Sequence, residues 1–181
     1  LGCKVIGIAG GPSKCALLHQ LGCAAAIDYK HESVGKRLQE LCPNGIDVYF
    51  DNVGGATLQA VLENLALGAR IVLCGSISEY TLTEPFGLTN YTRLRAKNAS
   101  MHGFFVYNFA HLFSEASEKL AAWIQQGDLQ PVQNIVDGFD NMPAALADLY
   151  SGANTGVQIC RVRGEPHDCA PLPPAVESLH S

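Results

Sequence analysis

Short apolar runs alternate with longer amphipathic stretches over most of the chain. The apolar runs are bounded by glycine, proline or polar residues, which is typical of buried strands. The stretches between them have helical spacing and helix boundary signals, such as Pro12 near one helix start and Gly22 just past its end. The predicted strands are residues 4–10, 24–28, 47–50, 69–74 and 100–106. The predicted helices are residues 12–21, 33–41, 56–65 and 112–126.

This alternation of strand and helix predicts an α/β fold with a mostly parallel sheet and right-handed crossovers. After Leu129 the pattern changes to a strand, a short helix and a terminal strand, predicted at residues 134–138, 143–150 and 156–162. Residues 165–181 carry four of the nine prolines and show no amphipathic period, so we expect them to be disordered.

Composition limits the class of ligand. The 181 residues, 48% of them hydrophobic, suffice for one domain with a substantial core. The formal net charge is −5 and no run of Lys or Arg occurs, which argues against nucleic acid or an acidic membrane surface as a partner. No apolar run approaches the roughly 18 residues needed to cross a bilayer. We therefore expect a small-molecule ligand and no membrane association.

Neither the cysteines nor the histidines indicate a metal site. The seven cysteines are odd in number and form no Cys-x-x-Cys pair, so the sequence predicts neither a disulfide framework nor a zinc site. A cytoplasmic, reducing location fits this usage. The six histidines show no His-x-x-x-His spacing and none lies in a nucleophile motif, which leaves a hydrolase without support.

Small and polar residues follow two of the predicted strands directly. Residues 51–55 read Asp-Asn-Val-Gly-Gly, and residues 74–80 read Cys-Gly-Ser-Ile-Ser-Glu-Tyr. In an open parallel sheet, ligands sit beyond the carboxyl ends of the strands, so both segments are placed to meet a nucleotide. Taken singly, each segment is also compatible with an ordinary turn.

The turn after the first predicted strand reads Gly-Gly-Pro-Ser-Lys. In a dinucleotide-binding fold this is the position that reads the ribose, where an NAD-binding chain has Asp or Glu. Here the acid is missing, and Ser13 and Lys14 offer a hydroxyl and an ammonium for a 2′-phosphate. NADP(H) is therefore favoured, although Lys14 could also be a solvated first-turn lysine.

Several longer segments together resemble one known family. They are residues 2–7, 13–14, 28–30, 45–55, 70–80, 138–145 and 152–156. With them, the chain from Gly2 to Val162 resembles the zinc-independent medium-chain dehydrogenase/reductases of the alkenal/one, prostaglandin and curcumin reductase type. The resemblance implies an NADPH-dependent enzyme that reduces the C=C bond of α,β-unsaturated carbonyls.

The resemblance also implies roles for single residues. Lys14 and Tyr29 would hold the adenosine 2′-phosphate, and Tyr80 would act in catalysis by hydrogen-bonding the substrate or the nicotinamide ribose. Hydride would pass to the β-carbon, while a hydroxyl donor stabilises the charge on the carbonyl oxygen. The full set of predicted cofactor contacts is Ser13, Lys14, Tyr29, Asn52 near the pyrophosphate, Cys74, Gly75, Ser76 and Ser78 along the ribose and nicotinamide, Phe104, Phe105 and Val106 at the nicotinamide, and Asn154 from the C-terminal segment.

The expected fold is thus α/β, with a Rossmann-like, doubly wound, mostly parallel sheet that is incomplete at its N-terminal side. Nothing matches Gly-x-Gly-x-x-Gly, so the first strand and its pyrophosphate turn would lie upstream of Leu1. In the strand order 3-2-1-4-5-6 that strand is the central one, between strands 4–10 and 47–50. The predicted parts are a partial dinucleotide-binding domain over residues 1–128, a C-terminal return segment over residues 129–163 and a disordered tail over residues 164–181.

We therefore expect the C-terminal, NADP(H)-binding part of an enone or alkenal reductase, with little or no turnover by these 181 residues alone. A quinone reductase of the same superfamily is an alternative, distinguished by activity on quinones. A non-catalytic NADPH-binding module is another. The resemblance also implies a homodimer that pairs along the strand at residues 100–106.

Overall fold

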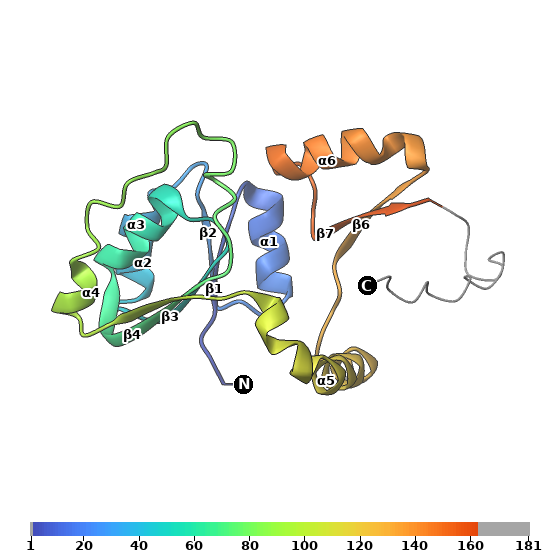
Figure 1. The fold of residues 1–181 in the computed structure, drawn as a ribbon. Helices are drawn as coiled ribbons and strands as arrows, with labels where there is room; N and C mark the ends of the chain where they lie inside the picture. Colours follow the sequence, from blue (N-terminus) through green and yellow to red (C-terminus); the bar gives the residue numbers. More distant parts are fainter. Residues whose placement is uncertain (1, 163–181) are drawn as a thin grey trace, which may run out of the picture. The chain divides into compact units, whose positions relative to one another are not determined.

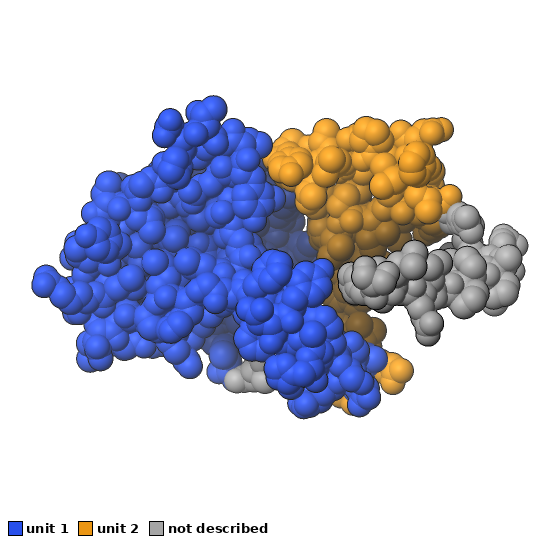
Figure 2. Space-filling model, viewed as in Figure 1, with its two compact units in different colours: residues 1–122 blue, residues 123–181 orange. Residues whose placement is uncertain are grey.

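The structure, a computed structural model, describes residues 2–162 (Figure 1). The chain forms two compact units, residues 1–122 and 123–181, which Figure 2 colours separately. Each unit is described here by itself. The predicted tail, residues 164–181, lies outside the described residues, and the predicted domain boundary at residue 128 stays a prediction.

The first unit alternates strands with helices, as the apolar pattern predicts. Every strand pair in it is parallel, so the predicted Rossmann-like α/β class is confirmed. Its elements are β1 (Ile6–Ala9), α1 (Pro12–Gln20), β2 (Ala25–Asp28), α2 (Val34–Leu41), β3 (Ile46–Asp51), α3 (Gly55–Glu63), β4 (Leu65–Leu73), α4 (Arg93–Ala96), β5 (Ser100–Gly103) and the 3₁₀ helix η1 (Val106–Leu112). Helix α5 (Phe113–Gln126) crosses the boundary between the units.

The strands of the first unit form two separate sheets. β1 pairs with β2, while β4 lies between β3 and β5 in a three-stranded sheet. Within residues 2–162, no strand pairs with the other edge of β1 or of β3, where a doubly wound sheet has its central strand. Val48 and Phe50 of β3 are 52% and 55% exposed, and β1 is only partly buried. The prediction that residues 4–10 form a buried strand is therefore wrong, because the sheet that contains β1 is open at this edge.

An apolar core joins the two sheets of the first unit. Its buried members come from β2, α2, α3 and β4, and they are Ile27, Leu38, Leu58, Val61, Leu62, Leu65, Ala69 and Ile71. Burial of each Leu, Ile or Val side chain contributes roughly 1.5–3 kcal/mol. Because β2 and β4 belong to different sheets, side-chain packing holds the sheets together without a strand ladder between them.

The last strand of the first unit is shorter than predicted. β5 ends at Gly103, so Phe104 and Phe105 follow it as coil and Val106 begins η1. Aromatic and β-branched residues favour strands by propensity. Here the Phe104 ring packs instead on Phe109 of η1, with 5.1 Å between ring centroids. The prediction of a strand that runs to residue 106 is therefore wrong, because tertiary packing overrides propensity.

The second unit contains β6 (Gln133–Asp137), the 3₁₀ helix η2 (Phe139–Asn141), α6 (Met142–Ser151) and β7 (Val157–Arg161). β6 and β7 pair in parallel, with Ile135 facing Ile159. Helix α6 ends at Gly152, whose φ of +68° is a left-handed conformation that favours glycine. The predicted order of strand, helix and strand is therefore confirmed.

Candidate functional site

Two groups of loops lie at the carboxyl ends of the strands in the first unit. The first loop cluster consists of the turns after β1 and β2, residues 10–14 and 29–32. The second loop cluster consists of the turn after β3 and the loop after β4, residues 52–55 and 74–80. Because parallel strands present their carboxyl ends at one edge of a sheet, each cluster joins residues that are far apart in the sequence.

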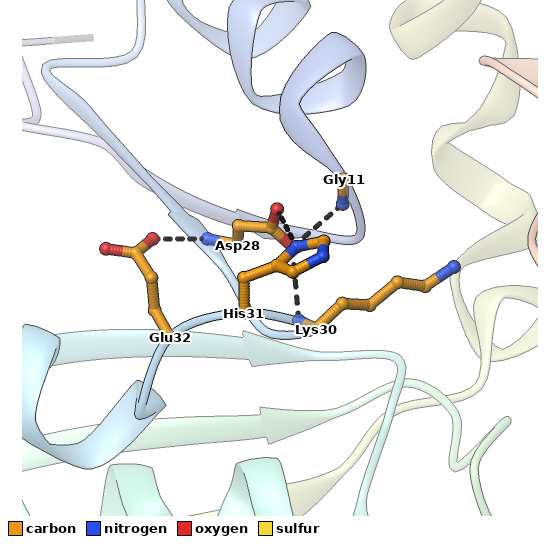
Figure 3. A network of polar contacts seen from close by, with 5 residues as sticks. All are labelled: Gly11, Asp28, Lys30, His31 and Glu32. Carbon is orange, nitrogen blue, oxygen red and sulfur yellow. Dashed lines mark hydrogen bonds and ion pairs between the residues drawn. The ribbon is translucent and has the colours of Figure 1, made fainter.

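Asp28, the last residue of β2, ties the first loop cluster together (Figure 3). Its Oδ1 accepts hydrogen bonds from the N–H of Gly11 at 2.8 Å and of Lys30 at 3.1 Å. Its Oδ2 lies 2.7 Å from His31 Nδ1, and its own N–H donates to Glu32 Oε2 at 2.8 Å. One carboxylate thus joins the turn after β1 to the turn after β2.

These contacts change the ionisation of Asp28. The N–H of Gly11 does most to lower its pKa, His31 and the N–H of Lys30 act in the same direction, and burial opposes them. Asp28 is therefore ionised at neutral pH, with both carboxylate oxygens engaged by the protein. The negative charge of Asp28 therefore stabilises the conformation of the two turns.

Gly10 is a point of close approach between these turns. A Cβ at this position would lie 2.8 Å from Lys30 Cε and 2.9 Å from Tyr29 Cε1. The Tyr29 ring and the Lys30 stem therefore lie directly on the glycine backbone. Ser13 and Lys14 lie in the first turn of α1, so the predicted contacts Ser13, Lys14 and Tyr29 all belong to the first loop cluster. Sequence reasoning missed Lys30, whose only local signal is its position next to Tyr29.

Asp51, the last residue of β3, has the corresponding place in the second loop cluster. It is fully buried, and its Oδ1 accepts from the N–H of Val53 at 2.9 Å, the N–H of Gly54 at 3.0 Å and the Tyr49 hydroxyl at 2.9 Å. Its Oδ2 is buried and has no hydrogen-bond partner among the described residues. Burial, and then the charge of Asp51, raise the pKa of Tyr49, so the phenol stays a donor.

Backbone hydrogen bonds fasten the loop after β4 to the turn after β3. The N–H groups of Cys74 and Gly75 donate to Asp51 O at 2.8 and 3.0 Å. Ser78 donates to Val53 O from its N–H at 3.1 Å and from its hydroxyl at 2.6 Å. The predicted contacts that these bonds bring together are Asn52, Cys74, Gly75, Ser76 and Ser78.

Glu79 closes the same loop on the N-terminus of α3. Its Oε1 accepts from the N–H of Gly55 at 2.9 Å, and its Oε2 accepts from the N–H of Phe86 at 3.3 Å. A carboxylate is stabilised at a helix N-terminus, where the unpaired N–H groups point. Sequence reasoning assigned Glu79 no role, because no local pattern shows a pairing with a residue 24 positions away.

Tyr80, the predicted catalytic residue, lies at the surface of the second loop cluster. Its side chain is 60% exposed, and its hydroxyl oxygen accepts from the N–H of Ser76 at 3.3 Å. A Cβ at Gly75 would lie 3.1 Å from that oxygen, so a small residue there lets the phenol fold back over the loop. This bond uses the hydroxyl oxygen as acceptor and does not use the hydroxyl hydrogen.

Phe104 lies beside the end of β4, since its N–H donates to the carbonyl of the last residue of that strand at 2.8 Å. Its ring centroid is 6.2 Å from that of Phe50 on β3 and 5.1 Å from that of Phe109. Phe105 and Val106 are exposed. Of the three predicted nicotinamide contacts, Phe104 thus belongs to an aromatic cluster at the strand ends. The other two, Phe105 and Val106, follow it in the chain and are exposed.

Asn154 belongs to the second unit, and its predicted contact with the cofactor stays a prediction. Its Nδ2 donates to Gly156 O at 2.9 Å.

The described residues contain no group of three or more His, Cys, Asp or Glu side chains that could hold a metal ion. None of the helices within residues 2–162 is long and apolar enough to cross a membrane.

Parallel strands with two such loop clusters at their carboxyl ends are typical of dinucleotide-binding α/β domains. Residues 1–125 match the family model described as zinc-binding dehydrogenase. That match covers more than half of the chain, so the chain belongs to the zinc-binding dehydrogenase family. Together with the relatives below, this match confirms the resemblance to NADPH-dependent medium-chain dehydrogenase/reductases.

Several of the similar proteins are reductases by name. The (+)-pulegone reductase of Mentha piperita is 39% identical over 166 residues, which cover 91% of this chain and 48% of the relative. The 2-alkenal reductase (NADP(+)-dependent) of Nicotiana tabacum is 40% identical over 167 residues, which cover 91% of this chain and 49% of the relative. The structure of CurA in complex with NADPH from Vibrio vulnificus is similar with a TM-score of 0.84 at 37% identity, covering 91% of this chain and 51% of that one. The chain therefore spans about half the length of the curated relatives it matches.

Proposed function

We propose that the chain is the cofactor-binding part of an NADPH-dependent oxidoreductase that reduces the C=C bond of α,β-unsaturated carbonyl compounds by hydride transfer. The observation that carries this proposal is the position of the loop clusters at the carboxyl ends of parallel strands, where such folds hold a dinucleotide. The relatives named pulegone reductase and 2-alkenal reductase support the substrate class. The structure of CurA with NADPH supports the cofactor.

The first loop cluster fits the adenosine 2′-phosphate of NADPH. The Ser13 hydroxyl, the Lys14 ammonium and the Tyr29 phenol come from the two turns that one carboxylate joins. The carboxylate of Asp28 has both oxygens engaged, so it does not compete for these donors as an open acceptor. A phosphate with a charge of about −1.5 to −2 is best met by such a set of donors and cations.

The second loop cluster fits the ribose and nicotinamide end of the cofactor. When bound, NADPH supplies the hydride. The Tyr80 hydroxyl, which keeps a hydrogen to donate, can stabilise the negative charge that develops on the carbonyl oxygen of the substrate. The aromatic cluster around Phe104 provides an apolar wall beside this loop.

The open edges of β1 and β3 are the reason to expect little catalytic turnover by this chain alone. A central strand with a glycine-rich turn would aim backbone N–H groups and a helix N-terminus at the pyrophosphate. The 181 residues contain no Gly-x-Gly-x-x-Gly motif, so we expect them to have little or no turnover by themselves. The cytoplasmic location and the homodimer that pairs along β5 also stay predictions.

Titration with reduced nicotinamide cofactors tests the cofactor assignment. We expect the 181-residue protein to bind NADPH at least tenfold more tightly than NADH. The physical reason is that a hydrogen bond to a charged group contributes roughly 1.5–3 kcal/mol, and about 1.4 kcal/mol is a factor of ten. Nicotinamide fluorescence measures both affinities. Equal affinity, or binding of neither cofactor, would contradict the assignment.

A fusion protein tests the reaction. Placing the N-terminal half of the tobacco 2-alkenal reductase ahead of Leu1 offers a strand to the open edges of β1 and β3. We expect the fusion to oxidise NADPH with a 2-alkenal, and Tyr80→Phe to lower kcat by roughly 10²-fold. Tyr91→Phe, at an exposed tyrosine of the same unit, is the matched control and should leave kcat unchanged.

The same assay separates the alternatives. Faster turnover of a quinone than of a 2-alkenal would indicate a quinone reductase. Binding of NADPH without turnover of either substrate by the fusion would indicate a non-catalytic module. Robust enone reduction by the 181 residues alone would contradict the expected inactivity of this chain.

A further inference from the structure

Lys30 is a cation of the first loop cluster that the predicted contacts do not include. We propose that Lys30 is a further specificity residue, which reads the adenosine 2′-phosphate together with Lys14 and Tyr29, and that Asp28 is the residue that positions it. This inference rests on the proposed function, because it names what the NADPH-binding turns of that same site recognise.

The backbone of Lys30 is held from the core side. Asp28 is 9% exposed, and its Oδ1 accepts both the Lys30 N–H at 3.1 Å and the Gly11 N–H at 2.8 Å (Figure 3). The two donors come from different turns and meet at one oxygen atom. The Asp28 carboxylate therefore helps to fix Lys30 relative to the start of α1, together with the hydrogen bond from the Tyr29 N–H to Ala9 O at 3.1 Å.

The side chain of Lys30 is placed by Gly10. A Cβ added at Gly10 would lie 2.8 Å from Lys30 Cε and 2.9 Å from Tyr29 Cε1, so both side chains pack against this glycine. Figure 3 shows the Lys30 side chain extended away from Asp28, with the ammonium at its far end. The Lys30 stem and the Tyr29 ring thus both contact the partly buried backbone of Gly10, two residues before α1.

Charge balance supports the same role. The ionised carboxylate of Asp28 keeps its negative charge, which two N–H groups and His31 stabilise, so a phosphate beside these turns needs more than one cation. Lys14 and Lys30 then bring two positive charges to the turns that it joins. A 2′-phosphate carries a charge of about −1.5 to −2 at neutral pH, which two lysines match more closely than one.

Titration with nucleotides that lack the nicotinamide tests Lys30 directly. Adenosine 2′,5′-bisphosphate and adenosine 5′-monophosphate differ only in the 2′-phosphate, and NMR titration of the 181-residue protein measures even millimolar affinities. We expect the bisphosphate to bind at least tenfold more tightly, and Lys30→Met to abolish most of that preference while the affinity for the monophosphate is kept. Lys30→Arg should restore the preference. Lys36→Met, at an exposed lysine on α2, is the matched control and should leave the preference intact.

The positioning role of Asp28 has its own readout. We expect Asp28→Ala to lower the preference for the bisphosphate as Lys30→Met does, because the turn that carries Lys30 is released. A merely structural role would lower both affinities together. Should Asp28→Ala fail to fold, Asp28→Glu keeps the charge but moves the carboxylate, and it should lower the preference in the same way.

The outcomes distinguish this inference from the function on which it rests. A wild-type protein without any preference for the bisphosphate would overturn the proposed NADPH site and this inference together. A wild-type preference that survives in Lys30→Met would overturn the role of Lys30 and leave the NADPH site standing. A preference that is lost in Lys30→Met but kept in the Asp28 variants would overturn the positioning role of Asp28.

Discussion

Asp28 and Asp51 each end a strand and fix a turn with their carboxylate, but they draw on different partners. Asp28 accepts from Gly11, 17 residues away, and its second oxygen meets His31, whose side chain is exposed. Among the described residues, the carboxylate of Asp51 accepts only from residues 49–54, and Asp51 is fully buried. The carboxylate of Asp28 therefore joins two turns near the surface, while that of Asp51 binds groups of its own strand and of the turn directly after it.

This difference predicts two kinds of mutational effect. Removal of a buried acceptor leaves its donors without water or protein partners, so changes at Asp51 should act on the stability of the fold. Removal of Asp28 frees turns that water can reach, so changes there should act on the ligand that the turns recognise. Variants at Asp51 and at Asp28 test the two halves of this comparison.

The largest effect is expected from Asp51→Ala. The N–H groups of Val53 and Gly54 and the Tyr49 hydroxyl would lose their acceptor in a buried place, and we expect a loss of about 3 kcal/mol in the free energy of unfolding. Urea denaturation measures it. Asp47→Ala, at an exposed position of the same strand, should change the free energy by less than about 0.5 kcal/mol. A similar small effect for both variants would contradict the comparison.

A smaller effect is expected from Tyr49→Phe, which removes one of the three donors to Asp51. We expect a loss of about 1 kcal/mol, again by urea denaturation. Because the hydroxyl acts through Asp51, the same change should cost nothing further in the Asp51→Ala background. Additive losses in the double variant would show that Tyr49 stabilises the fold by another route.

The smallest effect is the contribution of Asp28 to acid stability. Its pKa is lower in the folded protein than in the unfolded chain, first because of the Gly11 N–H. This contribution is therefore present above the ordinary Asp pKa of about 3.9 and is lost as the pH falls through the lower folded value. We expect Asp28→Asn to have a thermal midpoint that falls less than that of the wild type between pH 6 and pH 3. An equal fall would contradict the cited contacts.

The architecture follows from patterns that are local in the sequence, whereas most of the site does not. Apolar runs and helix signals suffice to predict the alternation of β1 to β5 with helices, and the known strand order predicts the gap between β1 and β3. The bond between Glu79 and Gly55, and the approach of Lys30 to Gly10, depend on tertiary packing that no period encodes. The end of β5 also depends on tertiary packing, because the ring of Phe104 packs on Phe109 and the strand stops at Gly103.

The measurement that tests the central claim most directly is a map of backbone amide shifts in the ¹H–¹⁵N spectrum on titration with NADPH and with NADH. Both loop clusters should respond to NADPH, with Gly11 and Lys30 reporting the first and Gly75 and Ser76 the second. NADH should shift the second loop cluster and leave the first nearly unchanged. Shifts confined to residues outside both clusters, or the same response to both cofactors, would contradict the account.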